Sequence, residues 1–418
     1  MNIDARPLRI ATLAHGHPSL STGGAEIAAH SLHKVLRGSP GVSALHVSCA
    51  PSGHIMTLAG GADGNEHLVA DTAIDNFSLL RRDPADPAAL LGLLESFQPQ
   101  VIHLHHVLGF GADLLLTLRL AFPAAVIVLT LHEFIAICHN QGQMMRTGGA
   151  LCERAAPTDC NSCFPEIEPG RFVRREASLR ALLSVVDSFI APSAFLARRY
   201  LDWGLPADRM IVIENALDFP PVRQVAATAK ARRGRFAYFG QMTPFKGIDI
   251  LLEAVAAIPD DEWAGSSLVL HASNLERQPE AFRLRIGALI ARAGPRVRLV
   301  GPYNNADLPR LMADIDWVVV PSIWWENSPL VIQEAFSNRR PVIASAIGGM
   351  AEKVIDGRNG LTFAAGDAAS LARTLLRAAD PKLWSSLQAG VTPPVAANDV
   401  GAWHLRLYHH MLARRARA

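Results

Sequence analysis

The sequence predicts an α/β protein of two domains, each a parallel sheet covered by helices, and three observations support this prediction. The chain has 418 residues, which exceeds one ordinary domain and fits two of about 200 residues each. Short apolar runs alternate with helical patterns, as is typical of parallel sheets wrapped by helices. Hydrophobic residues make up 50% of the chain and charged residues 19%, so large cores can be buried.

The first domain is expected to span residues 1–218. Its apolar runs predict strands at 8–14, 101–105, 126–131, 188–191 and 210–213. After the first strand, Ser21 to Glu26 should open a helix. Residues 114–131 should form a helix and then a strand, because Arg119 and Pro123 interrupt that apolar stretch. An insertion that contains cysteines follows at 138–163.

A linker and a second domain are expected next. Residues 219–234 contain paired prolines followed by Ala, Thr, Lys and Arg, which indicates a linker. The second domain is expected at 235–385, with strands at 235–240, 267–271, 297–301, 316–320 and 341–344 and a helix at 248–257. A helical segment, 386–418, ends in the basic run 414–417, which favours either a solvated terminus or contact with anionic lipid.

The stretch from Trp324 to Phe336, which follows the apolar run 317–320, is the most informative part of the sequence. A buried strand is expected to lead into a loop, and Asn327 or Ser328 could cap a helix that begins near Pro329. The bare amides and dipole of such a helix start attract an anion such as a diphosphate. Glu326 precedes this helix and Glu334 lies within it. The alternative is that both are solvated acids, but together they suit a ligand with phosphates and hydroxyls, as in a nucleotide sugar.

Three further segments place polar groups or glycines after an expected strand. Gly23 and Gly24 let a backbone approach a ligand, although they also suit a simple helix cap. Lys246, before the helix at 248–257, suits a diphosphate leaving group, and the alternative is a surface lysine. His132 follows the strand at 126–131, where open α/β sheets gather ligands. The first loop lacks G-x-G-x-x-G, which weakens a dinucleotide-binding oxidoreductase interpretation.

Cysteine and histidine clusters raise the question of metal binding. Cys138, Cys152, Cys160 and Cys163 could form a tetrahedral zinc site, or could be buried free cysteines. His103, His105, His106 and His139 lie near His132 in the sequence, but a metal site there lacks a carboxylate at useful spacing. Arg171, Arg174, Arg175 and Arg180 lie on an expected helix, either as a solvated face or facing a phosphorylated or lipid-linked acceptor.

The motif around Glu326 and Glu334 resembles the signature of the retaining GT-B glycosyltransferases of family 4. The resemblance continues in residues 340–345, 348–352 and 355–363 and extends over most of the chain. It implies two Rossmann-like domains facing across a cleft, with a C-terminal helix that crosses back to the first domain. The residues that it would place at the site are Glu326, Glu334, Lys246, His132, Gly23, Gly24, Asn327, Ser328, Leu330, Val331, Gly348 and Gly349.

The resemblance also implies a role for each group. Glu334 would hold the donor ribose, while Glu326, His132 and the Gly348–Gly349 loop would hold its sugar. Amides near Ser328, Leu330 and Val331, together with Lys246, would meet the diphosphate. Gln241 stands where the family usually has arginine, which removes one cation from this clamp. No cofactor is expected to be required for catalysis, and zinc at the cysteines would be structural.

The expected function is transfer of a sugar, with retention, from a nucleoside diphosphate sugar to an unknown glycan, lipid-linked or small-molecule acceptor. Polysaccharide or glycan biosynthesis is the expected setting. The alternative is a non-catalytic relative that binds a nucleotide sugar and assists a partner enzyme, which Gln241 favours. A net charge of +2 argues against a nucleic-acid partner. The N-terminal residues lack the layout of a signal peptide, so a cytoplasmic protein is expected, with peripheral membrane contact as an option.

Overall fold

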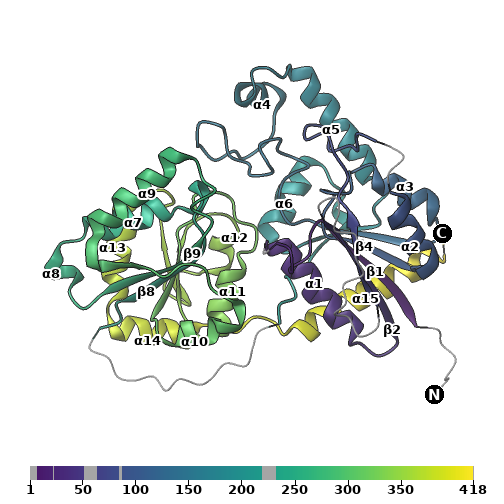
Figure 1. The fold of residues 1–418 in the computed structure, drawn as a ribbon. Helices are drawn as coiled ribbons and strands as arrows, with labels where there is room; N and C mark the ends of the chain where they lie inside the picture. The colour runs from purple at the N-terminus through teal and green to yellow at the C-terminus, as the bar shows by residue number, and fades with distance from the viewer. Residues whose placement is uncertain (1–6, 22, 51–63, 84–86, 219–231, 418) are drawn as a thin grey trace. The chain divides into compact units, whose positions relative to one another are not determined.

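The computed structural model describes residues 7–21, 23–50, 64–83, 87–218 and 232–417. The chain divides into two compact units, which are described separately below. The first unit comprises Met1–Asp218 and Val395–Ala418, and the second comprises Phe219–Pro394 (Figure 1). Most of the expected linker, up to residue 231, lies outside the described residues.

The first domain contains a seven-stranded sheet in which every described pair of neighbouring strands is parallel. The strand order is β3-β2-β1-β4-β5-β6-β7. The strands are β1 (Leu8–Ala14), β2 (Val42–Ala50), β3 (Glu66–Ala70), β4 (Val101–Leu104), β5 (Val126–Thr130), β6 (Ser188–Ala191) and β7 (Met210–Val212). Because parallel strands end at the same edge, the loops after β1, β4 and β5 are neighbours.

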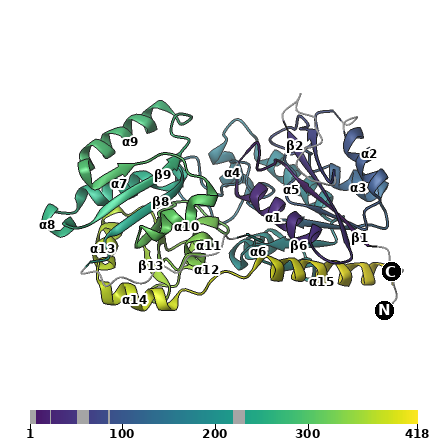
Figure 2. The same cartoon turned by 60° about the horizontal axis from the view of Figure 1, so that its bottom comes forward.

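Helices connect these strands and cover the sheet. They are α1 (Gly24–Arg37), α2 (Ala88–Phe97), α3 (Leu114–Ala121), α4 (Pro157–Cys163), α5 (Pro169–Leu183), α6 (Ala194–Trp203), the 3-10 turn η1 (Ala207–Arg209) and α15 (Ala397–Arg415). The C-terminal helix α15 packs on this domain, beside α1 and β5 (Figure 2). Its Tyr408 is fully buried in the same core as Ile10 and Val128.

The second domain contains a six-stranded sheet that is likewise parallel throughout its described pairs. Its order is β10-β9-β8-β11-β12-β13. The strands are β8 (Arg235–Gln241), β9 (Ser267–Ser273), β10 (Val297–Leu299), β11 (Trp317–Val320), β12 (Val342–Ser345) and β13 (Gly360–Phe363). The loops after β8, β11 and β12 therefore meet at one edge of this sheet.

Two hydrophobic clusters lie on the two sides of the second sheet. The cluster around Trp317, Leu251 and Leu371 involves α7, α9, α13 and α14, and the cluster around Val318, Ile332 and Met350 involves α10, α11 and α12. The helices and 3-10 turns of this domain are η2 (Pro244–Lys246), α7 (Ile248–Ala257), α8 (Asp260–Trp263), α9 (Glu280–Ala293), η3 (Gly294–Arg296), η4 (Asn305–Asp307), α10 (Leu308–Ala313), α11 (Leu330–Ser337), α12 (Gly348–Lys353), α13 (Ala368–Ala378) and α14 (Pro381–Gly390). Helix α14 still belongs to this core, because Trp384 and Leu387 are buried in it.

The expected strands all exist, with ends that differ by at most two residues, and the expected helix at 248–257 matches α7. Three strands were not anticipated: β2, β3 and β13. β2 carries His46 and two serines, Ser43 and Ser48, among its apolar residues, so its pattern is weaker than that of a continuously apolar central strand. Among the described residues, no helix is long and apolar enough to cross a membrane.

Candidate active site

The loops after β8 and β11 are held together by a close backbone contact at Gly247. This glycine has φ +63°, and a Cβ at this position would overlap the carbonyl of Pro321. The contact joins the end of η2, which carries Lys246, to the loop that carries Glu326. Only glycine supplies both this conformation and the missing side-chain volume. Local backbone packing therefore brings together two candidate site residues that lie 80 positions apart.

Lys246 and Glu326 form an ion pair at this contact. Lys246 Nζ lies 2.5 Å from Glu326 Oε1, and Ser322 Oγ donates to the same oxygen at 2.8 Å. Burial acts to raise the pKa of Glu326, but the Lys246 ammonium and the hydrogen bonds outweigh burial and hold the pKa below its ordinary value. Glu326 is thus a carboxylate at neutral pH. The two groups, which were assigned to separate parts of the ligand, contact each other in this structure.

Gly348 and Gly349 shape the backbone next to Glu326. The Gly349 amide donates to the Glu326 carbonyl at 2.7 Å, and a Cβ on Gly349 would overlap the Asn327 carbonyl. Gly348 has φ +57°, and its Cβ would lie 3.0 Å from the Glu326 carbonyl oxygen. The glycines thus allow the loops after β11 and β12 to touch, in addition to any contact with a ligand.

Helix α11 begins at Leu330, with Val331 also in its first turn. The expected side-chain cap from Asn327 or Ser328 is wrong: Pro329 is the cap residue, and no side chain caps the helix. The first amides of a helix lack acceptors within the helix, so a start without a side-chain cap offers them to an anion. Ser328 is instead within 3.4 Å of the Gln333 amide nitrogen.

Glu334, one turn into α11, is in the opposite state from Glu326. Burial alone raises the pKa of Glu334 to about 7. Its carboxylate also raises the pKa of Tyr303, which places the two side chains near each other, although burial is the larger cause of the Tyr303 shift. In the described parts of the chain, its carboxylate has neither a hydrogen bond nor an ion pair. A carboxylate in this state would gain from hydroxyl donors supplied by a ligand.

Gln241, which stands in the place of the expected arginine, ends β8 with an exposed side chain. Its backbone carbonyl accepts a hydrogen bond of 2.6 Å from the Tyr238 hydroxyl. The residue is therefore positioned at the carboxyl edge of the sheet, as expected, but it brings no positive charge there.

In the first domain, the glycine loop after β1 closes around a carboxylate. Gly23 is the cap residue of α1 and Gly24 its first residue. Glu26 is buried, accepts a hydrogen bond of 2.6 Å from Ser21 Oγ, and lies 3.5 Å from His15 Nε2. A Cβ on Gly23 would overlap the Glu26 carboxylate. The sequence motif contained Glu26, but its place inside the loop becomes evident only from the fold.

His132 lies at the end of β5 among other histidines. Its Nε2 is 3.1 Å from His105 Nδ1. Burial lowers the pKa of His132 to about 3, with smaller contributions from His106 and His15. His132 is therefore a neutral imidazole at physiological pH and can exchange hydrogen bonds with a sugar without carrying charge. A pocket beside it is lined by His106, Glu133, Leu131, Ile135 and Tyr200, among others.

His103 and His106, two of the histidines near His132 in the sequence, make contacts within the protein. His103 is fully buried, and its two ring nitrogens lie 2.7 Å from the hydroxyls of Tyr408 and Thr130. His106 Nε2 lies 2.9 Å from Glu133 Oε1. His103 thus links β4 and β5 to α15. Arg175, considered earlier as part of a basic helix face, is also buried and donates to the carbonyls of Phe77, Ile135 and Ala136.

A group that could hold a metal was missed from the sequence. His17, His30 and Glu66 place their ligand atoms within 4.8 Å of one another. His33 Nε2 is 3.7 Å from Glu66, and the ring of His46 is 5.1 Å from that of His33. The spacing of His30 and His33 on one helix face was a usable signal. Glu66 and His46 could not be added from sequence, because β2 and β3 were not anticipated.

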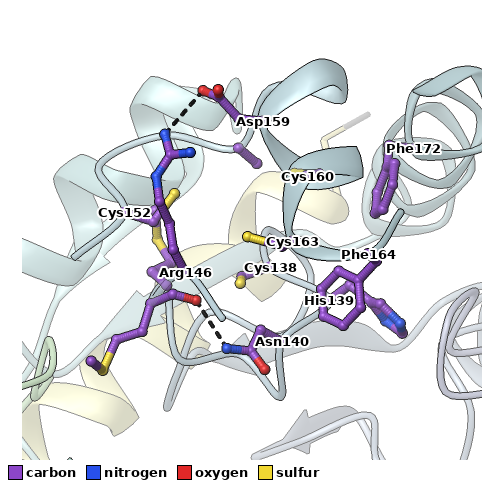
Figure 3. Close-up of a pocket in the computed structure, with 13 residues that line it drawn as sticks. Cys138, His139, Asn140, Arg146, Cys152, Asp159, Cys160, Cys163, Phe164 and Phe172 are labelled. Carbon is purple, nitrogen blue, oxygen red and sulfur yellow. Dashed lines mark hydrogen bonds and ion pairs between the residues drawn. The ribbon is translucent and has the colours of Figure 1, made fainter. Parts of the chain in front are cut away.

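The four cysteines of the insertion line one pocket, shown in Figure 3. None of the four forms a disulfide, and Cys138 and Cys163 lie 25 positions apart in the chain. Arg146 and Asp159 form an ion pair of 3.3 Å at its rim.

Comparison with known proteins identifies both domains. Residues 22–219 match the family model of Glycosyltransferase Family 4, and residues 233–380 match that of Glycosyl transferases group 1. The D-inositol 3-phosphate glycosyltransferase of Nocardioides sp. is 31% identical over 199 residues, 43% of this chain and 43% of that protein. The chain thus spans less than half the length of this relative. The enzyme of the same name from Geodermatophilus obscurus is 25% identical over 359 residues, 82% of this chain and 70% of that protein.

Solved structures share the fold over nearly the whole chain. Anabaena Alr3699/HepE in complex with UDP and glucose has a TM-score of 0.62 and 19% identity, covering 98% of this chain and 99% of that chain. Sucrose-phosphate synthase from Thermosynechococcus elongatus has a TM-score of 0.70 and 21% identity, covering 97% of this chain and 100% of that chain. With a family model matching each of its two Rossmann-like domains, the chain belongs to the group 1/family 4 glycosyltransferases, which have the GT-B fold.

Proposed function

We propose that this protein transfers a sugar from a nucleoside diphosphate sugar to an acceptor hydroxyl with retention of anomeric configuration. The observation that carries the proposal is the pair of carboxylates flanking the start of α11. Glu326 is charged and held by Lys246, whereas Glu334 is partly buried and its carboxylate lacks a hydrogen bond or ion pair among the described residues. Such a pair suits a ligand with an anion between two sets of hydroxyls.

In this proposal the second domain binds the donor. The ribose hydroxyls donate to Glu334, and the amides of Leu330 and Val331 receive the diphosphate at the start of α11. Lys246 exchanges part of its contact with Glu326 for the diphosphate, which frees Glu326 to accept hydroxyls of the sugar. Uridine diphosphate is the first nucleotide to test, because the similar Anabaena protein was solved with UDP-glucose.

The chemical step breaks the bond between the anomeric carbon and the diphosphate oxygen, and the bonding electrons leave with the diphosphate. Lys246 and the helix amides stabilise that developing charge. The acceptor oxygen bonds to the same face of the carbon, and its proton passes to the departing diphosphate. We prefer this route to a glycosyl-enzyme, because Glu26 and Glu133 of the first domain already contact Ser21 and His106. The step requires no cofactor.

The acceptor is proposed to bind the first domain, beside His132 and the pocket next to it. The matched curated proteins are named for an inositol phosphate acceptor, so a phosphorylated polyol is one candidate, beside glycan and lipid-linked acceptors. We further propose that the protein acts in the cytoplasm in polysaccharide or glycan assembly. Contact with a membrane surface would then depend on the acceptor.

Calorimetric titration with UDP-, GDP- and ADP-sugars tests the donor site. We expect one nucleotide to bind selectively and Glu334→Ala to weaken it by about tenfold or more, because ribose hydroxyl contacts are lost. Glu280→Ala, which removes an exposed acid from α9, is the matched control and should bind normally. If a folded protein binds none of the three, the proposed donor site is wrong.

Transfer itself needs a separate test with the nucleotide sugar so identified. Incubation with phosphorylated polyols, glycans and lipid-linked sugars should release nucleoside diphosphate, and NMR of the product should show retained anomeric configuration. Donor binding without turnover of any acceptor would favour the non-catalytic relative. An inverted product would contradict front-face attack.

A further inference from the structure

The insertion between β5 and α5 has little regular structure to hold it. Within residues 131–168, all of which are described, the structure shows only α4 and an isolated bridge between Met145 and Leu151. Ordering a segment of this length costs much conformational entropy, so it usually needs stabilising contacts in addition to the hydrogen bonds of its turns. Its sequence contributes four of the five cysteines of the chain.

The four cysteines converge from three separate parts of the insertion (Figure 3). Cys138 lies in a turn in which its own amide donates to the Phe134 carbonyl. Cys152 follows the bridge between Met145 and Leu151, and its amide donates to the Met144 carbonyl. Cys160 and Cys163 lie three positions apart on α4 and therefore share a helix face. All four line the same pocket. Three separate backbone segments therefore place cysteine side chains around the same pocket.

The sulfur chemistry of the pocket suits a divalent metal. All four cysteines line it, and no disulfide joins any of them. Four closely spaced thiols cannot ionise together unless a cation compensates the charge. A divalent metal deprotonates thiols that coordinate it.

Other groups around the pocket suit a negatively charged metal–thiolate centre. The backbone amides of Asn140 and Met144 hydrogen-bond the Cys138 sulfur, an arrangement that stabilises a thiolate. Arg146 lines the pocket, and the buried Arg175 interacts electrostatically with Cys138 and Cys160. A zinc ion with four thiolates carries two net negative charges, which these arginines would offset.

We propose that Cys138, Cys152, Cys160 and Cys163 bind one zinc ion in a tetrahedral structural site. Protein ligands at all four positions leave none open for water or substrate, so the ion would be structural. Zinc–sulfur bonds of about 2.3 Å would place the sulfurs about 3.8 Å apart. No three of these sulfurs lie within 4.8 Å of one another in this structure, so the proposed binding would draw them inward.

The ion would brace the loop that carries His132. The Cys138 amide donates to the Phe134 carbonyl, and the Phe134 amide donates to the Gly142 carbonyl. Gly142 packs closely against Glu133, because a Cβ added at Gly142 would overlap the Glu133 carboxylate. Glu133 is the residue directly after His132. Fixing Cys138 therefore restrains the turn that ends at the candidate sugar-binding histidine. This consequence depends on the proposed function, whereas zinc binding does not.

Metal analysis of the full-length protein, purified without chelating resin, tests the site. We expect about one zinc per chain by mass spectrometry, and X-ray absorption at the zinc edge should show four sulfur neighbours near 2.3 Å. Nitrogen and oxygen neighbours would overturn the assignment and move the ion to His17, His30 and Glu66. Iron in place of zinc, or a protein without metal, would also overturn it.

Substitution of single cysteines tests whether the zinc binds at this pocket. Cys160→Ser and Cys163→Ser should lose the zinc, whereas Cys49→Ala, which changes the remaining cysteine on β2, should retain it. Should the serine variants misfold, a mercurial titration of wild-type protein replaces them, with zinc release expected as four thiols react. Fewer than five free thiols after denaturation without reductant would indicate a disulfide and contradict the proposal. Nucleotide binding measured on the same samples keeps this result separate from the donor-site test.

Discussion

At the scale of single residues, Glu326 and Glu334 show how surroundings give one residue type two chemical states. Lys246 and Ser322 hold Glu326 as a carboxylate, whereas burial alone raises the pKa of Glu334 to about 7. The difference follows from partners and not from distance along the chain, since the two are eight positions apart. Glu326 is ionised and can accept hydrogen bonds from hydroxyls, whereas Glu334 becomes ionised near neutral pH.

Glu334 predicts a pH-dependent affinity for the nucleotide. Hydrogen bonds from ribose hydroxyls favour the ionised carboxylate, so binding should lower the pKa of Glu334 from about 7 and release a proton. Affinity should therefore rise as the pH increases from about 6 to about 8, by up to about tenfold per pH unit below the free-state pKa. Titration calorimetry in buffers of different ionisation enthalpy measures both the affinity and the proton release.

The matched variant for this prediction is Glu334→Gln. It keeps the shape of the side chain but cannot ionise, so its weaker binding should vary much less over the same pH range. A wild-type affinity that is flat between pH 6 and 8, or a variant with an equal slope, would assign the dependence to another group.

At the scale of elements, the candidate donor site is made by turns that follow strands. Neighbouring strands β8, β11 and β12 bring their loops to one edge, and glycines let those loops touch backbone to backbone. Gly247 contacts Pro321, and Gly349 contacts Glu326 and Asn327. The ion pair of Lys246 and Glu326 therefore depends on glycines that have no side chain to bind a ligand.

Gly349→Ala should disturb this arrangement. The added Cβ would overlap the Asn327 carbonyl and weaken the hydrogen bond from the Gly349 amide to Glu326. We expect destabilisation of about 1–3 kcal/mol and a loss of nucleotide affinity, because the backbone around Glu326 must shift. Urea unfolding and calorimetry measure the two effects. Gly287→Ala is the control, since a Cβ there meets nothing within 4 Å on α9 and should be neutral or stabilising.

At the scale of the whole molecule, the first domain buries several histidines. Burial lowers the pKa values of His33 and His404 to about 4 and that of His132 to about 3. His46, His103 and His105 are shifted in the same direction for the same reason. These imidazoles are neutral in the folded protein, while in the unfolded chain they titrate near pH 6.5.

This difference predicts loss of stability in mild acid. Between about pH 6.5 and pH 4 the unfolded chain binds more protons than the folded protein, so stability falls as the pH decreases. Each such histidine contributes up to about 1.4 kcal/mol per pH unit in this interval. Urea unfolding should give a lower midpoint at pH 5 than at pH 7.5. Replacing the exposed His409 by Gln should leave this dependence intact, and equal midpoints at the two pH values would refute the explanation.

The central strands and several site positions could be predicted from the sequence because their causes are local. Predominantly apolar runs marked β1, β4, β5, β8, β11 and β12, and a proline next to polar residues marked the start of α11. β2 and β3 were missed because their composition is mixed, and with them the cluster of His17, His30 and Glu66 was missed. The side-chain cap at α11 was predicted wrongly, because the chain places Pro329 itself at the cap.

By itself the sequence determined the α/β architecture, the strand ends that carry the candidate site, and its polar groups, since these depend on short-range patterns. Tertiary structure alone decided which groups pair and which remain buried without a partner. Lys246 meets Glu326 across 80 positions, His103 meets Tyr408 across 305, and four cysteines meet around one pocket. Charge state and pairing depend on distance and burial in three dimensions, and backbone packing at a few glycines sets both.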